Sequence, residues 1–234
     1  MPEDATEKQQ FPPDRPLGLG EIFAQTTHIY GARIWAAAGI GLIAAAAFVA
    51  RTYIGDIAGI PVVALSITAA WAIAVRVAIG DSFGEACAQA AVRGPALLVI
   101  AVVAAVPFAV ALSQLYLVLI AVAWLALLGF AIPVAVVEQP PDERFVHRVG
   151  FALHRSLDLA KAEYLHAVGV VAALVMGVFV VGVILFGSLR GFADNGDLAA
   201  GAITQVVLAP FFFLGLSVLY FDQRGRALSS ARGD

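Results

Sequence analysis

Residues 138–163, EQPPDERFVHRVGFALHRSLDLAKAE, form the longest polar interruption in this chain of 234 residues. The stretch holds four of the fourteen Lys and Arg residues, and long apolar runs flank it on both sides. A helix over its second half would place apolar residues on one face and basic residues beside them. This pattern is typical of a helix that lies at a membrane surface. We therefore interpret the stretch as a cytoplasmic belt, with two membrane hairpins before it and one after it.

The composition is that of a membrane protein. The chain is 61% hydrophobic and 13% charged, and its mean hydropathy is +0.91. Soluble domains are about half apolar and about a quarter charged. The charges also cluster, so the apolar residues form runs long enough to cross a bilayer. A net charge of −3 does not favour nucleic-acid binding, and the single cysteine excludes an internal disulfide.

We predict an all-α fold with six transmembrane helices arranged as three hairpins. Each hairpin follows a short amphipathic helix, over residues 17–30, over residues 81–94 and within the belt. Ser82 and Glu85 have the spacing of a capping box. The expected spans are residues 34–50, 57–79, two within the uncharged run 94–137 with a turn at Ser113–Gln114, 164–189 and 198–221.

The expected domain organisation is simple. Residues 1–16 are acidic and proline-rich, which predicts a disordered N-terminal tail. Residues 17–223 would form a single six-helix membrane domain, and residues 224–234 a C-terminal tail. Pro107, Pro133 and Pro210 fall well inside spans, and we expect kinks there, with neighbouring helices satisfying the freed carbonyl groups.

The distribution of basic residues predicts the orientation. With six spans, twelve of the fourteen Lys and Arg residues fall on the side of the two termini, and only Arg51 and Arg190 fall on the other side. The positive-inside rule then places both termini in the cytoplasm. An odd number of spans would destroy this partition.

The unit of short helix and hairpin recurs along the chain. Leu19-Gly20-Glu21 ends eleven residues before Ala32, and Phe83-Gly84-Glu85 ends eleven residues before Ala96. A third copy would begin in the belt, with a weaker likeness. Two interpretations remain open: a threefold internal repeat, or the connector spacing that any six-helix membrane protein shows.

Four stretches together resemble one bacterial family. They are Leu19-Gly20-Glu21-Ile22, Glu138 at the end of the fourth span, Ala152-Leu153-His154-Arg155-Ser156-x-x-Leu159 in the belt, and Tyr220-Phe221-Asp222-x-Arg224 after the last span. The chain is similar, over nearly its whole length after residue 16, to the membrane domain of some bacterial glycerophosphodiester phosphodiesterases and to free-standing six-helix relatives. The enzymes carry their catalytic residues on a separate barrel domain. The resemblance therefore implies a membrane module in the bacterial inner membrane and argues against phosphodiesterase activity.

The charged residues of these stretches should meet at the cytoplasmic rim. We expect an ion-pair cluster that ties the hairpins together, because carboxylates beside lipid are costly unless they are paired. The alternative is a set of ordinary helix-end charges that face water, each worth about 0–1 kcal/mol. The proposed members are Glu21, Glu138, Arg155, Asp222 and Arg224.

Three further basic residues of the belt, Arg144, Arg148 and Lys161, are expected to contact lipid headgroups. The four histidines lack metal-ligand spacing, and we interpret them as surface residues. The sequence predicts no metal, cofactor or catalytic residue.

The spans carry no charged residue near their middle, where ion-coupled transporters usually place one. Their deeper polar residues include Thr204 and Gln205, which would line a cavity if the spans enclose one. The leading prediction is thus a non-enzymatic membrane module that contacts lipids or a partner protein through its cytoplasmic rim. The alternative is a transporter or flippase-like carrier of a lipid or small amphiphile. The lipid, the partner and the oligomeric state are left open.

Overall fold

The structure is a computed structural model that describes residues 15–111, 117–138, 145–191 and 196–232, and every element in these ranges is helical. The elements are α1 (Leu19–Ala32), α2 (Ile34–Ile54), α3 (Asp56–Ile79), α4 (Phe83–Val92), α5 (Gly94–Ile100), the π-helix η1 (Ala101–Ala105), α6 (Val106–Ala111), α7 (Val118–Leu128), α8 (Ala131–Val137), α9 (Phe145–Ala162), α10 (Tyr164–Leu189) and α11 (Gly196–Arg232).

The prediction of an all-helical chain with several membrane-spanning helices is confirmed. Five helical stretches of the described chain are long and apolar enough to cross a membrane: α2, α3, α7 with α8, α10 and α11. A sixth span is reached only if the stretches Phe83–Val92 and Gly94–Ala105 are taken together, and these are bent by 76°. The bend lies at Arg93, where the second short helix was expected to end, and residues 94–111 of the expected third span are helical throughout. The turn expected at Ser113–Gln114 lies outside the described residues.

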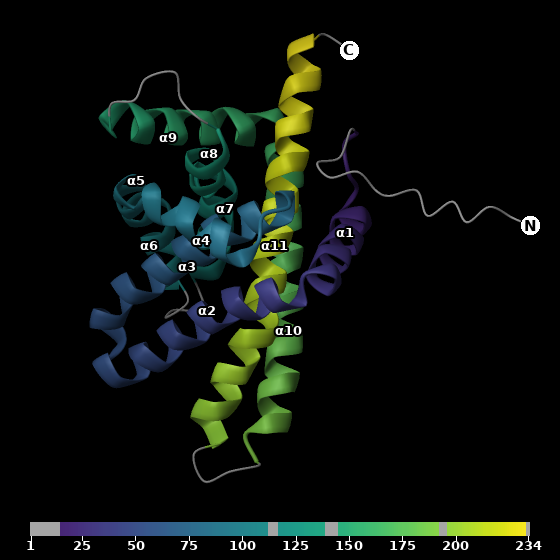
Figure 1. Cartoon of the computed structure of the whole chain (residues 1–234). Helices are drawn as coiled ribbons and strands as arrows, with labels where there is room; N and C mark the ends of the chain where they lie inside the picture. The colour runs from purple at the N-terminus through teal and green to yellow at the C-terminus, as the bar shows by residue number, and fades with distance from the viewer. Residues whose placement is uncertain (1–14, 112–116, 139–144, 192–195, 233–234) are drawn as a thin grey trace, which may run out of the picture.

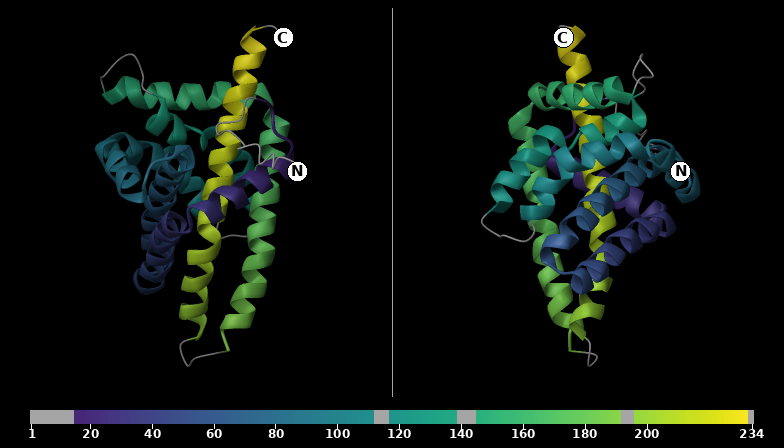
Figure 2. Two further views of the ribbon diagram at one scale, coloured as in Figure 1. Left: turned by 45° about the vertical axis from the view of Figure 1, so that its right-hand side comes forward. Right: turned by 90° about the vertical axis from the view of Figure 1, so that its left-hand side faces the viewer.

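Two long helices form the axis of the molecule, and another helix passes beside one of them. Helices α10 and α11 pack along each other, as do α2 and α3 (Figure 1). Helix α9 lies over α7 and α8 and passes beside α11, whose last turns extend beyond it, as both views in Figure 2 show. The end of α11 lies at the same end of the molecule as α9.

Glycines at helix boundaries account for two of the sharp turns. Gly55 joins α2 to α3 with a φ of 85°, and Gly80 ends α3 with a φ of 125°. Both values lie in the region that glycine adopts at little cost. The predicted capping box is confirmed: the Glu85 backbone N–H donates to the Ser82 hydroxyl, and the Ser82 backbone N–H donates to the Glu85 carboxylate.

Pro107 explains the irregular helix before it. A proline cannot donate to the carbonyl four residues earlier, which here belongs to Val103. The indole N–H of Trp124 on α7 donates to that carbonyl oxygen at 3.0 Å, and the backbone widens into the π-helix η1 just before Pro107. A neighbouring helix therefore satisfies the group that the proline frees, as predicted.

Pro133 and Pro210 have different effects. Near Pro133 the helix breaks at Gly129, whose carbonyl accepts from the Ile132 backbone N–H at 3.1 Å, and α7 is separated from α8. Pro210 lies inside α11 and frees the carbonyl of Val206. Gly41 of α2 packs against that carbonyl so closely that an added Cβ would lie 2.2 Å from the oxygen. The glycine is needed for this close helix contact.

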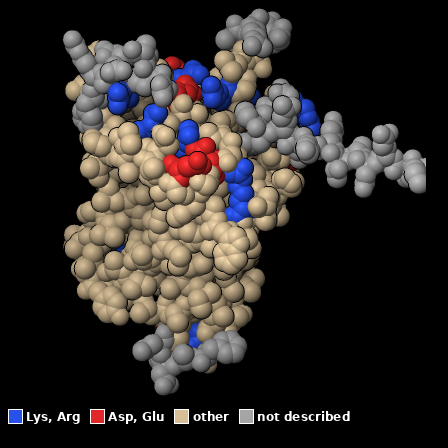
Figure 3. All heavy atoms as spheres, viewed as in Figure 1, with Lys and Arg blue, Asp and Glu red and all other residues tan. Residues whose placement is uncertain are grey.

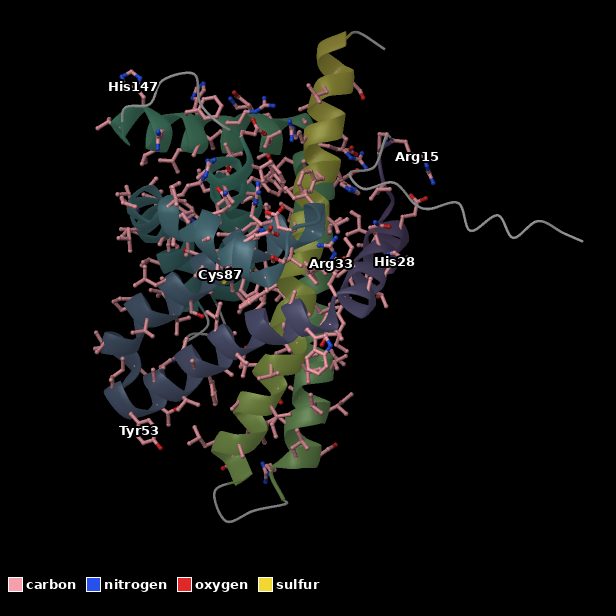
Figure 4. All side chains as sticks on the ribbon, viewed as in Figure 1. Arg15, His28, Arg33, Tyr53, Cys87 and His147 are labelled. Carbon is pink, nitrogen blue, oxygen red and sulfur yellow. The ribbon has the colours of Figure 1, made fainter. Side chains whose placement is uncertain are left out.

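Polar and apolar surfaces are separated along the molecule. Lys, Arg, Asp and Glu side chains gather toward the end that carries α9, above a broad belt that is almost without charge (Figure 3). On α10 this belt exposes large apolar side chains, among them Met176, Phe179 and Ile184. His147 of α9 lies at the top of the molecule, and Tyr53 near the end of α2 lies well below it, above the lower ends of α10 and α11 (Figure 4). This surface is that of a membrane-embedded protein.

The last helix is longer than the predicted span. Helix α11 continues without a break beyond Phe221 to Arg232, so the described part of the expected C-terminal tail is helical. The expected N-terminal tail, residues 1–16, is described only at residues 15 and 16.

Candidate functional site

The first group of charged residues surrounds Glu138, which follows the last residue of α8. The Arg155 Nε of α9 lies 3.1 Å from Glu138 Oε2, and the Tyr220 hydroxyl of α11 donates to Oε1 at 2.9 Å. The Arg224 Nε lies 3.8 Å from the same Oε1. The Glu138 side chain is 13% exposed. We call these four residues the Glu138 cluster; it joins the end of α8 to α9 and α11.

A second group surrounds Asp222, whose side chain is fully buried. Its Oδ2 lies 2.9 Å from Arg226 Nε and 3.2 Å from His166 Nε2, while its Oδ1 accepts from the Leu17 backbone N–H at 2.7 Å. Arg226 also donates to the Leu17 carbonyl oxygen at 2.8 Å and pairs with Glu163. We call these five residues the Asp222 cluster; it joins the start of the described chain to α10 and α11.

Glu21 belongs to neither cluster. Its carboxylate pairs with Arg15 at 2.5 Å and accepts from the Gly18 backbone N–H at 2.8 Å. The Gly18 hydrogen bond and then the Arg15 guanidinium lower the pKa of the Glu21 carboxyl. The side chain thus closes the first turn of its own helix, where a negative charge also complements the helix dipole.

The structure therefore brings together three of the five predicted cluster residues, Glu138, Arg155 and Arg224. Asp222 has separate partners for a geometric reason. Two residues along an α-helix are about 200° apart around its axis, so Asp222 and Arg224 face nearly opposite directions. A contact of both with Glu138 would require a distorted helix.

Of the predicted headgroup contacts, Arg148 and Lys161 are exposed on α9. Lys161 also lies 3.7 Å from Asp158 on the same helix. Arg144 lies outside the described residues. The opposite face of α9 is buried against the bundle, and the Ser156 hydroxyl donates to the Leu127 carbonyl oxygen at 2.9 Å. That carbonyl belongs to the last turn of α7, which ends at the break near Gly129.

Thr204 and Gln205, the predicted cavity residues, do not line the hollow described on α9. This open hollow of about 430 Å³ runs along the helix. Thr204 is 9% exposed and faces Gly182 of α10, while Gln205 is half-buried. The lining residues are Val146, His147, Gly150, Phe151, His154, Arg155 and Asp158.

Sequence reasoning missed the basic and main-chain members of the Asp222 cluster. His166 was expected as a surface residue, but it lies partly buried between Asp222 and Arg226. The available signal was the i, i+4 spacing of Asp222 and Arg226, which places both on one helix face. Leu17 gave no signal, because it takes part through its backbone.

The described residues contain no group of three His, Cys, Asp or Glu side chains placed to hold a metal ion. Comparisons of the chain with protein-family models, with curated proteins and with solved structures find no match. The two clusters and the exposed cations of α9 are therefore the features from which a function can be argued.

Proposed function

We propose that this chain is a non-enzymatic integral membrane module that contacts anionic lipid headgroups through the rim formed by α9. The observation that carries the proposal is the position of α9, which lies over α7 and α8 and beside α11, above a belt almost without charge (Figures 1 and 3). A helix in this position would lie at the headgroup level of a bilayer. The exposed Arg148 and Lys161 would then meet lipid phosphates.

The clusters support this role because they hold α9 in place. The Glu138 cluster connects α9 to both α8 and α11. The Asp222 cluster uses Glu163, the residue between α9 and α10. A firmly held interfacial helix presents its cations in a fixed arrangement, which lowers the entropic cost of binding headgroups.

The proposed topology has six spans as three hairpins, each after a short cytoplasmic helix, with both termini in the cytoplasm of a bacterium. Twelve basic residues would lie on the cytoplasmic side and two on the other. The positions of those two support the proposal. Arg51 lies near the end of α2 and Arg190 directly after α10, and both helix ends point away from α9 (Figure 1).

The motifs that resemble the membrane domain of glycerophosphodiester phosphodiesterases are consistent with such a module. In this proposal the chain shares the membrane part of those enzymes and none of their catalysis. Transport of a lipid or small amphiphile is the alternative. It requires a cavity at the level of Thr204 or Gln205, and the burial of Thr204 against α10 does not favour it.

The proposal is tested by lipid-dependent stability. Purified protein is placed in nanodiscs of phosphatidylcholine, with and without phosphatidylglycerol, and its melting temperature is measured. We expect phosphatidylglycerol to raise the melting temperature, and Arg148→Gln and Lys161→Gln each to weaken this effect. Each cation near an anionic surface contributes about 1 kcal/mol, or about a fivefold change in headgroup binding.

Arg190→Gln is the matched control, since Arg190 is exposed at the opposite end of α10. It should leave the lipid effect unchanged. An equal effect of phosphatidylglycerol on all four proteins would exclude headgroup binding by α9. In that case the same exposed cations would point to a protein partner instead.

A further inference from the structure

The segment before α1, residues 15–18, is held by its backbone. It is not helical, and we call it the strap. Both main-chain polar groups of Leu17 are bound: its N–H donates to Asp222 Oδ1 at 2.7 Å, and its carbonyl accepts from Arg226 Nη2 at 2.8 Å. Two atoms of one ion pair thus bind the two polar groups of one residue.

This arrangement is how a protein recognises an extended peptide. A strand that pairs with its neighbour also satisfies the N–H and the carbonyl of a single residue. Main-chain hydrogen bonds supply affinity, and a pocket for a side chain supplies specificity. Here the Leu17 side chain is 4% exposed and belongs to the apolar core. Leu19, two residues further on, is 45% exposed.

The binding pair is held rigidly by residues outside the strap. Arg226 donates through Nε to Asp222 and through Nη1 to Glu163, besides the bond from Nη2 to Leu17. These partners fix the guanidinium on α11 without any contribution from the strap. The site is therefore preorganised, which lowers the cost of binding.

The strap residues on both sides of Leu17 are held by Glu21 and not by Asp222. Arg15 and Gly18 both bond to Glu21, so the turn into α1 keeps its shape without Asp222. Leu17 thus lies between two residues that bond to the same Glu21 carboxylate, whereas its own backbone bonds to α11. The strap can leave Asp222 and Arg226 while α1 stays packed through its buried residues, such as Ile22.

We propose that Asp222 and Arg226 form a peptide-binding site, which recognises an extended main chain with one buried leucine and is occupied by the chain's own strap. Release of the strap opens the site to an external peptide of the same chemistry. This inference is independent of lipid binding by α9.

The first experiment measures how firmly the strap is held. In a Cys87→Ala background, the rate of maleimide labelling is measured for Leu17→Cys, Leu19→Cys and Ile22→Cys. We expect slow labelling at positions 17 and 22 and fast labelling at position 19. Adding Arg226→Gln should raise the rate at position 17 by about tenfold or more, the effect of losing a charge-assisted hydrogen bond.

Arg224→Gln is the matched control on the same helix, because Arg224 contacts Glu138 and not the strap. It should leave the rate at position 17 unchanged. The rate at position 22 should stay low in the Arg226→Gln protein. Equal increases at positions 17 and 22 would show that α1 leaves as a whole, and the proposal of a separate strap would be overturned.

The second experiment tests the site with a peptide in trans. A fluorescent peptide with the sequence of residues 12–21 is titrated with the full-length protein and with its Leu17→Asp variant, and anisotropy is recorded. We expect the variant to bind the peptide at least about tenfold more tightly than the wild type, because its own strap no longer competes. A peptide that itself carries Leu17→Asp should not bind. Equal weak binding by the wild type and the variant would reject the site.

Discussion

The Glu138 cluster and the Asp222 cluster lie on nearly opposite faces of the same stretch of α11, and they differ in what they fasten. In the first, one carboxylate meets two guanidinium groups and a tyrosine hydroxyl, all from side chains of helices. In the second, the two carboxylates of Asp222 and Glu163 meet the guanidinium of Arg226, and backbone groups of Leu17 complete the set.

The difference separates two roles. The Glu138 cluster fixes the position of α9 across the bundle, whereas the Asp222 cluster fixes a non-helical segment to the bundle. If Arg155 or Arg224 is removed, Glu138 keeps its contact with the other arginine. Asp222 is fully buried, and the loss of Arg226 leaves it with His166 and one backbone N–H. We therefore expect the second cluster to be the more sensitive.

The largest effect is expected from Arg226→Ala. It leaves the buried Asp222 carboxylate without its guanidinium partner, and breaking a buried ion pair costs about 3 kcal/mol or more. For a chain of this length, each kcal/mol lowers the melting temperature by about 2–4 °C. The measurement is thermal unfolding in detergent. A melting temperature within the error of the wild type would show that Asp222 is not held by this pair.

A smaller effect is expected from Arg155→Ala. Glu138 keeps its contacts with Arg224 and the Tyr220 hydroxyl, so the expected loss is one charge-assisted hydrogen bond, about 1.5 kcal/mol. The same thermal assay measures it.

Because the clusters share no partner, the double variant with Arg226→Ala should lose the sum of the two single effects, within about 0.5 kcal/mol. A larger or smaller sum would mean that the two clusters act as one.

The smallest effect is expected from Glu21→Gln, which tests the attachment outside both clusters. The pKa of Glu21 is lowered in the folded protein. Its contribution is therefore present above the ordinary carboxyl pKa and is lost as the pH falls through the lowered value. The hydrogen-exchange protection factors at the start of α1, which correct for the intrinsic effect of pH, should fall on acidification in the wild type and much less in Glu21→Gln. An unchanged acid response in the variant would assign it to another group.

Several features of the fold could be predicted from local sequence. The capping box of Ser82 and Glu85 and the satisfaction of the carbonyl freed by Pro107 depend on neighbours in the chain and on general rules of helices in lipid. The sequence could not predict that the helix breaks near Pro133 or widens into a π-helix before Pro107. A proline determines only which backbone hydrogen bond is lost. The packing around it decides whether the helix bends, widens or breaks.

The candidate site divides in the same way. Glu138, Arg155 and Arg224 could be grouped because charges at helix ends near lipid need partners. The assignment of Asp222 to the same group failed because it ignored the rotation between residues 222 and 224. The hydrogen bonds of Asp222 and Arg226 to the Leu17 backbone could not be predicted. Backbone N–H and carbonyl groups are the same at nearly every residue, so the sequence does not show which of them are bound.

What the sequence by itself determined is where the chain is apolar, helical and long enough to cross a bilayer. Lipid imposes these properties on each segment separately, because every backbone polar group must be satisfied within its own helix. Only the tertiary structure decided which charges meet and that Leu17 is bound to α11. The Leu17 contacts join residues about two hundred positions apart. All of these contacts depend on how each helix is rotated about its axis, and the lipid environment does little to fix that rotation.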